Sequence, residues 1–121
     1  MRRHVYAASE AVAGVIREPW GSLTWMASGK IGNVDRLTLG RVVIKKGHHN
    51  PRHMHLACEE VLYLLAGRLE HSLGDGKVTL GPGDTITVPA GVFHNAVNVG
   101  DADADMIVAY SAANRDMVLQ K

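Results

Sequence analysis

Turn-forming residues recur along this chain at short and regular intervals. Glycine and proline interrupt the sequence roughly every eight to twelve residues. The interruptions fall at residues 29–32, 47–51, 67, 74–76, 81–83, 89–91 and 100. Turns at this spacing are typical of short strands joined by tight connections. The pattern therefore predicts an all-β sandwich or barrel.

The segments between these turns have the composition of strands. They are rich in Val, Ile, Leu and Thr, which suit a pleated sheet. The predicted strands are residues 20–28, 37–45, 60–65, 77–80, 85–88, 93–99 and 106–110. In the first of these, Leu23, Trp25 and Ala27 share one face. The sequence Gly74-Asp75-Gly76 predicts a tight hairpin, because glycine adopts positive φ without strain.

The N-terminal residues allow two interpretations. Residues 9–17 could form a helix capped by Ser9, or they could be an extended arm. No internal repeat, linker or change in composition marks a second domain, and 121 residues suffice for one hydrophobic core. We expect residues 1–121 to form a single domain.

Composition and charge exclude several classes of partner. Hydrophobic residues make up 46% of the chain and charged residues 21%, as in soluble globular proteins. The net charge is +1 and both signs are scattered, so we expect neither nucleic acid nor an anionic membrane as partner. No apolar segment resembles a signal peptide or a membrane span. Cys58 is the single cysteine, which fits a reducing compartment, and we expect a cytoplasmic protein.

Histidine is unusually frequent: the chain has seven, and all but His4 lie between positions 48 and 94. His53 and His55 are two residues apart, so in a strand both would project from one face about 7 Å apart. A short turn before Glu60 would return its carboxylate towards them, so that one hairpin carries three ligands. His94 follows the turn Pro89-Ala90-Gly91 and can supply a fourth. This spacing predicts a metal site with three imidazoles and one carboxylate.

Two stretches of the sequence resemble the two motifs of the cupin superfamily. The first is Gly47, five residues, His53-Met54-His55, four residues, Glu60, six residues and Gly67. The second is Gly83, five residues, Pro89-Ala90-Gly91, two residues, His94, three residues and Asn98. The resemblance covers about residues 36–111, with residues 1–35 as an N-terminal arm. It implies a cupin double-stranded β-helix, a jelly-roll barrel, with one metal ion near its axis on His53, His55, Glu60 and His94.

Other candidate ligands fit less well. Glu59 competes for the carboxylate role, but only Glu60 gives the six-residue interval to Gly67. The remaining histidines, His4, His48, His49 and His71, are predicted to be packed or surface residues, and Cys58 a buried, unreactive thiol. The alternating Asp101, Asp103 and Asp105 lack the glycine and glutamate of a calcium loop, since Met106 and Ala112 occupy those positions. They predict a solvated turn.

A site with nitrogen and oxygen ligands suits Fe(II), Mn(II), Ni(II), Cu(II) or Zn(II). Four protein ligands leave two adjacent positions on an octahedral ion, and one carboxylate leaves a local charge of about +1. We therefore expect a small, oxygen-rich and anionic substrate, such as an enolate, a hydroxy acid or a diol. The resemblance implies an enzyme of the dioxygenase, decarboxylase or sugar isomerase type. The alternative is a binding module that captures a sugar or a metal without turnover.

Side-chain alternation along residues 60–65 adds expectations about the surface. Leu62 and Leu64 should face inward with Glu60, while Val61, Tyr63 and Leu65 should face outward. An apolar outer face needs a cover, either residues 20–28 or a second subunit, and we expect a homodimer.

Candidates for proton transfer are Arg41, His49, Glu59 and Tyr110. Met54 and Phe93, which alternate with predicted ligands, should belong to the core. Ala96 should share the face of His94 and leave room above the metal.

Overall fold

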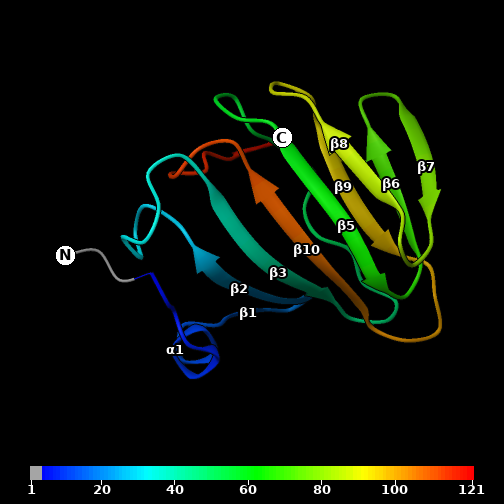
Figure 1. The fold of residues 1–121 in the computed structure, drawn as a ribbon. Helices are drawn as coiled ribbons and strands as arrows, with labels where there is room; N and C mark the ends of the chain where they lie inside the picture. Colours follow the sequence, from blue (N-terminus) through cyan, green and yellow to red (C-terminus); the bar gives the residue numbers. More distant parts are fainter. Residues whose placement is uncertain (1–3) are drawn as a thin grey trace.

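The computed structural model describes residues 4–121, and in this range two antiparallel sheets face each other (Figure 1). The larger sheet has the strand order β1-β2-β3-β10-β5-β8, and the smaller sheet has the order β11-β4-β9-β6-β7. The elements are α1 (Ala8–Ala13), β1 (Ile16–Glu18), β2 (Gly21–Ala27), β3 (Thr38–Ile44), β4 (His53–Met54), β5 (Glu60–Ala66), β6 (Leu69–Leu73), β7 (Gly76–Leu80), β8 (Thr85–Val88), β9 (His94–Asn98), β10 (Ala104–Tyr110) and β11 (Val118–Leu119).

This architecture confirms the predicted all-β jelly roll. Strands far apart in the sequence lie side by side, as β3 with β10 and β4 with β9 do. The hydrophobic core lies between the two sheets and draws buried side chains from both. The core residues are Val42, Ile44, Cys58, Leu62, Leu64, Leu69, Leu80, Ile86, Ala96, Ala104, Met106, Val108 and Tyr110.

Strand β5 shows the predicted alternation most clearly. Leu62 and Leu64 are buried, whereas the three residues that alternate with them are 41%, 42% and 45% exposed. The exposed residues are Val61, Tyr63 and Leu65. Glu60 has the parity of the buried leucines, so the fold directs its carboxylate between the sheets.

The N-terminal residues differ from both interpretations. Helix α1 spans only Ala8–Ala13, and Ser9 does not cap it. The helix begins after Ala7, whose backbone N–H donates to the Glu10 carboxylate at 2.8 Å. Residues 16–18, expected as the end of a helix or as an arm, pair instead with β2. The segment expected to precede the barrel thus adds β1 and β2 to the larger sheet, and its first three residues lie outside the described range.

The hairpin that was expected to carry three ligands is absent, because β4 and β5 belong to different sheets. Strand β4 pairs with β9 and β11, while β5 lies between β10 and β8. Residues 55–59 therefore cross from one sheet to the other. A hairpin and a crossing between the sheets would both bring Glu60 back towards the histidines. The number of residues between His55 and Glu60 does not distinguish the two arrangements.

Two glycines have the positive φ angles expected of turns, and both turns help to position the site. Gly74 has φ +59 in a two-residue loop, confirming the predicted hairpin, here between β6 and β7. Gly67 has φ +98, and a Cβ there would lie 2.8 Å from the Ala104 Cα. Gly67 is therefore required both by its backbone conformation and by the close approach of β10. Strands β6 and β11 were not among the predicted strands.

Residues 20–28 do not cover the outer face of β5. They form β2, which extends the larger sheet at the side of β3. Trp20, Leu23 and Trp25 pack against the core instead. The outer side chains of β5 therefore remain exposed.

Two smaller expectations have mixed outcomes. Met54 and Phe93 are half-buried and lie outside the core, because they alternate with the inward-facing ligands. Residues 99–103 form the predicted turn, but Asp105 lies within β10.

Among the described residues, no helix is both long enough and apolar enough to cross a membrane.

Candidate metal centre

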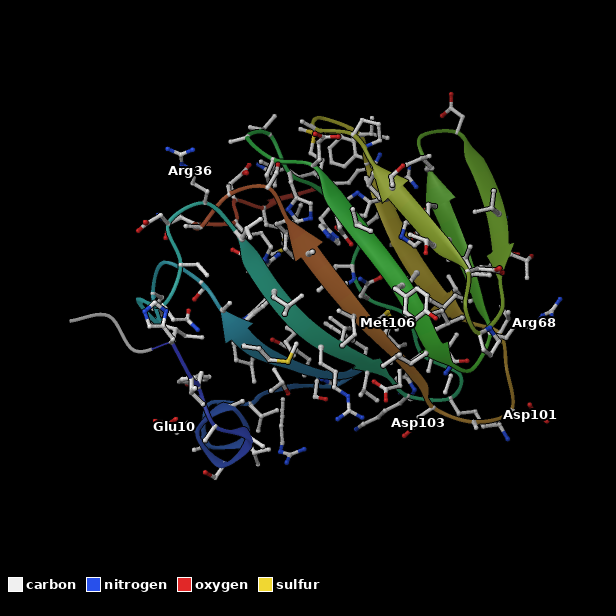
Figure 2. All side chains as sticks on the ribbon, viewed as in Figure 1. Glu10, Arg36, Arg68, Asp101, Asp103 and Met106 are labelled. Carbon is white, nitrogen blue, oxygen red and sulfur yellow. The ribbon has the colours of Figure 1, made fainter. Side chains whose placement is uncertain are left out.

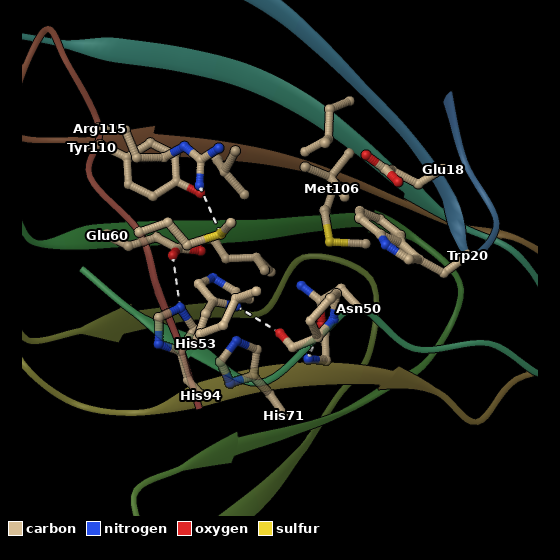
Figure 3. Close-up of a pocket in the computed structure, with 18 residues that line it drawn as sticks. Glu18, Trp20, Asn50, His53, Glu60, His71, His94, Met106, Tyr110 and Arg115 are labelled. Atoms are coloured by element: carbon tan, nitrogen blue, oxygen red, sulfur yellow. Dashed lines mark hydrogen bonds and ion pairs between the residues drawn. The ribbon is translucent and has the colours of Figure 1, made fainter. Parts of the chain in front are cut away.

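Four side chains converge between the sheets: His53, His55, Glu60 and His94. His53 and His94 are directly opposite each other in the β4–β9 pair, and Glu60 reaches them from the facing sheet (Figure 3). His55 lies just after β4. One potential ligand atom from each residue lies within 4.8 Å of all the others, and all four residues are buried. The structure thus brings together all four predicted ligands, with Glu60 supplying the carboxylate.

A backbone carbonyl fixes the orientation of each imidazole. The Nδ1 atom lies 2.7 Å from the Pro51 oxygen in His53, 2.5 Å from the Asp116 oxygen in His55, and 2.9 Å from the Val92 oxygen in His94. A carbonyl oxygen only accepts hydrogen bonds, so each Nδ1 carries a proton. In a neutral imidazole the Nε2 atom then presents a lone pair, which is the state of a metal-binding histidine.

These lone pairs face a negative charge. The Nε2 atoms of His55 and His94 lie 3.1 Å and 3.0 Å from Oε1 of Glu60. Two such electron-rich atoms repel each other unless a proton or a metal cation lies between them. Neighbouring ligands of an octahedral ion, each about 2.1 Å from it, are roughly 3 Å apart. The residues present therefore fit one divalent ion.

Burial sets the protonation of the site. Burial lowers the pKa of His53 to about 4, and His94 and His55 disfavour its charged form further. Burial alone would raise the pKa of Glu60, but in the metal-free protein a proton held between the carboxylate and the Nε2 atom of His55 or His94 keeps this pKa well below its usual range. His53 is thus neutral and Glu60 ionised near neutral pH, as metal binding requires of these two ligands.

The segment after β10 supports this cluster from outside. The Asp116 carboxylate accepts hydrogen bonds from the backbone N–H groups of Leu56 and Ala57, at 2.6 and 3.1 Å. These bonds lower the pKa of Asp116. Since the Asp116 carbonyl also orients His55, this residue fixes both a ligand and the crossing that leads to Glu60.

A cavity of about 200 Å³ opens beside the cluster and suits a small molecule. His53, Glu60 and His94 form part of its wall, and Ala96 borders it on the face of His94 as predicted. The rest of the lining is mostly apolar. It comprises Glu18, Trp20, Leu23, Val42, Asn50, Pro51, Leu62, His71, Met106, Val108, Tyr110, Arg115, Met117 and Leu119.

Of the four candidates for proton transfer, only Tyr110 borders this cavity. Its ring lies 4.9 Å from the His55 ring, centroid to centroid. Burial raises the pKa of Tyr110, and the nearby charge of Glu60 raises it further, so the phenol keeps its proton.

Arg41, His49 and Glu59 lie elsewhere. Arg41 alternates with the inward-facing Val42 and points out of the sheet, where it binds Asp105 at 2.6 and 2.7 Å. His49 and Glu59 are exposed and do not line the cavity. These three candidates thus lie away from the cavity, and their sequence positions did not reveal which way they face.

Among the polar residues of the cavity wall, His71, Asn50 and Arg115 were not predicted from the sequence. His71 is buried and stacks against His94, with ring centroids 5.8 Å apart, although it does not belong to the ligand cluster. Side-chain alternation along β6, with Leu69 and His71 both buried, could have revealed it. Asn50 lies three residues before His53, inside the first motif. Arg115 follows the last predicted strand, and no sequence pattern connected it with the site.

Replacing a ligand should empty the site. We expect His53→Ala and His94→Ala to reduce bound metal from near one equivalent to less than about a tenth, because the remaining ligands bind too weakly. His71→Ala and His49→Ala, outside the ligand cluster, should retain the metal. Elemental analysis of protein purified without added metal measures this. Equal metal content in all four variants would contradict the assignment.

Acid should destabilise the metal-free protein through His53. The unfolded chain takes up a proton as pH falls through about 6.5, whereas folded His53 does so only near 4. The unfolding free energy should therefore fall by about 2 to 3 kcal/mol from this residue between pH 7 and 4.5. Urea unfolding at the two pH values measures the loss, and His53→Asn should show a smaller one. An equal loss in His53→Asn would show that His53 is not the group responsible.

Comparison with known proteins places this chain in a family. Residues 40–110 match the family described as "Cupin domain". The chain is 35% identical to germin-like protein 3-8 of Oryza sativa subsp. japonica over 63% of its own length and 36% of that protein. It is 26% identical to oxalate oxidase GF-2.8 of Triticum aestivum over 94% of its length and 56% of that protein.

Solved structures agree on the fold. An oxalate decarboxylase from Bacillus subtilis superposes with a TM-score of 0.83 at 16% identity, over 91% of this chain and 31% of that one. The chain thus spans between about a third and just over half of the relatives it matches. The family match covers more than half of the chain and contains all four ligands of the buried cluster, and the chain therefore belongs to the cupin domain family.

Proposed function

We propose that this chain is an enzyme that uses one divalent transition-metal ion to act on a small, oxygen-rich acid. The observation that carries the proposal is the buried cluster His53, His55, Glu60 and His94 at the wall of a small cavity. A bound ion would supply Lewis acidity and, if it is iron or manganese, one-electron chemistry with dioxygen. The residues present suit Fe, Mn, Ni, Zn or Cu.

The chain's own residues would prepare the site for this chemistry. Carbonyl groups hold the three imidazoles in one orientation, so little reorganisation is needed when ligands bind. Leu62, Met106 and Val108 form an apolar wall that limits the entry of water. Protonated Tyr110 can donate a hydrogen bond from the same cavity. These features favour catalysis over simple capture of a metal.

The activities in the names of the relatives support a narrower choice of reaction type. An oxalate oxidase and an oxalate decarboxylase act on a small dicarboxylic acid by name, and both resemble this chain. We therefore propose oxidation by dioxygen or decarboxylation of a small carboxylic acid as the reaction, in preference to sugar isomerisation. We do not propose oxalate itself as the substrate, since this chain spans only part of each of these proteins.

A screen of small acids tests this function. We expect the purified protein with its own metal to consume dioxygen or release carbon dioxide with at least one acid among oxalate, glycolate and larger 2-hydroxy and 2-oxo acids. His94→Ala should lose this activity by at least about a hundredfold, whereas Lys77→Gln, on exposed strand β7, should retain it. Binding of an acid to the metal-loaded protein without any product would instead support the non-catalytic binding module.

We also propose that two copies of the chain associate through the outer face of the larger sheet. Val61, Tyr63 and Leu65 are exposed on β5, next to Leu39 on β3 and Ile107 on β10. Such a contiguous apolar surface is unusual on a monomer. Arg41 and Asp105 lie side by side on the same face, so two copies related by a twofold axis could exchange this ion pair.

Light scattering coupled to gel filtration tests the dimer. We expect twice the monomer mass of 13.1 kDa for the natural chain. Tyr63→Glu should dissociate the dimer, because it buries an unpaired charge in the interface. Lys77→Glu, on exposed strand β7, should leave it intact. A monomeric natural chain at micromolar concentration would contradict the proposal.

A further inference from the structure

Arg115 brings a permanent positive charge to the cavity wall. It is the one arginine or lysine among the described residues that line this cavity. It lies in the segment that follows β10, outside the barrel strands. Figure 3 shows its guanidinium group beside Tyr110, on the same side of the cavity as Glu60.

The structure holds this guanidinium in a defined position. Its central carbon lies 4.9 Å from the Trp25 ring centroid and 5.4 Å from that of Tyr110. Stacking of this kind orients the plane of an arginine. The flanking residues are also tied down, since the Ala113 carbonyl accepts from the Gly29 N–H at 2.8 Å and Asp116 binds the crossing after His55. Arg115 is therefore placed by two rings and two anchored neighbours, unlike a surface arginine.

The hydrogen-bond donors of Arg115 lack a strong acceptor. Within the described residues its hydrogen bond goes to the Met117 sulfur at 3.7 Å, and no carboxylate forms an ion pair with it. Thioether sulfur is a weak acceptor, and a guanidinium group has five N–H donors. The Trp25 and Tyr110 ring centroids are 6.2 Å apart, so both rings lie to one side of the guanidinium group and leave an N–H edge available on its other side. A carboxylate is the group that binds such an edge through two parallel hydrogen bonds.

Charge and shape restrict what can bind. Glu18 lies with Trp20 at the opposite side of the cavity from Arg115, so an anionic group is favoured at the Arg115 side (Figure 3). The wall between them includes Leu23, Val42 and Met106, which offer no polar partners. The Arg115 guanidinium carbon is no more than about 10 Å from the His55 ring, through Tyr110. Arg115 and the ligands Glu60 and His94 line the same cavity, so one small molecule can contact both parts.

We propose that Arg115 binds the carboxylate of a small substrate acid, whose hydroxyl or keto oxygen faces the ligand cluster and whose apolar part lies against Trp20, Leu23 and Met106. This proposal rests on the proposed function and narrows its substrate class. It assigns specificity for a carboxylate to a residue outside the metal site. It also favours acids with an apolar group over acids as small as glycolate.

Calorimetric titration of the metal-loaded protein tests this role with matched probes. The probes are mandelate and 1-phenyl-1,2-ethanediol, which share the phenyl group and the benzylic hydroxyl but differ in the carboxylate. Arg115→Gln should weaken mandelate binding about 10- to 100-fold, the usual effect of losing a hydrogen bond to a charged group. Binding of the neutral diol should not change. Arg115→Lys should lie between, because lysine keeps the charge but not the fork of donors.

Controls separate this role from folding and from the metal site. Metal content should be equal in the natural chain and both Arg115 variants, which shows that the cluster is intact. Arg68→Gln, exposed before β6, should bind both probes as the natural chain does. Mandelate should also bind more tightly than glycolate. Equal mandelate affinity in the natural chain and Arg115→Gln, or no mandelate binding to a metal-loaded natural chain, would overturn the inference. Absence of bound metal would instead contradict the proposed function.

Discussion

The arrangement of the site depends on three hydrogen bonds that turn lone pairs towards a carboxylate. Pro51, Val92 and Asp116 each accept from a histidine Nδ1, so the Nε2 atoms of His53, His94 and His55 point into the centre between the sheets. The buried Glu60 carboxylate meets the Nε2 atoms of His55 and His94 at about 3 Å. Without a proton or a metal ion between these atoms, this arrangement would concentrate electron density in a low-dielectric space. The jelly roll therefore provides a binding site whose electrostatics favour a positive ion.

The two sheets supply different ligands of the site. The smaller sheet supplies His53 and His94 as facing residues, and the larger sheet supplies Glu60 from β5. The last residues of the chain return across the barrel, pair with β4 through β11, and bring Asp116 to His55 and Arg115 to the cavity. Residues 111–119 thus connect ligand geometry with the wall that a substrate would contact. A small barrel can in this way carry both a metal site and a selective pocket.

Local sequence patterns predicted the features that depend on period and spacing. Alternation along β5 correctly separated buried Leu62 from exposed Tyr63, and motif spacing selected Glu60 over Glu59. Features that depend on long-range pairing were not predictable. The crossing between β4 and β5 looks like a hairpin in sequence, and the outward direction of Arg41 depends on the register of β3 with β10. Arg115 reaches the cavity only because the chain returns after β10. The expected cytoplasmic location stays a prediction.

Diffraction from crystals of the purified protein, recorded at the absorption edges of iron, manganese, nickel, copper and zinc, tests the central claim most directly. The account predicts one anomalous peak, within about 2.0 to 2.3 Å of the three Nε2 atoms and a Glu60 oxygen. The edge at which the peak appears would identify the ion. Direct hydrogen bonds from protonated Nε2 atoms to Glu60, without a peak even after soaking with these ions, would contradict it.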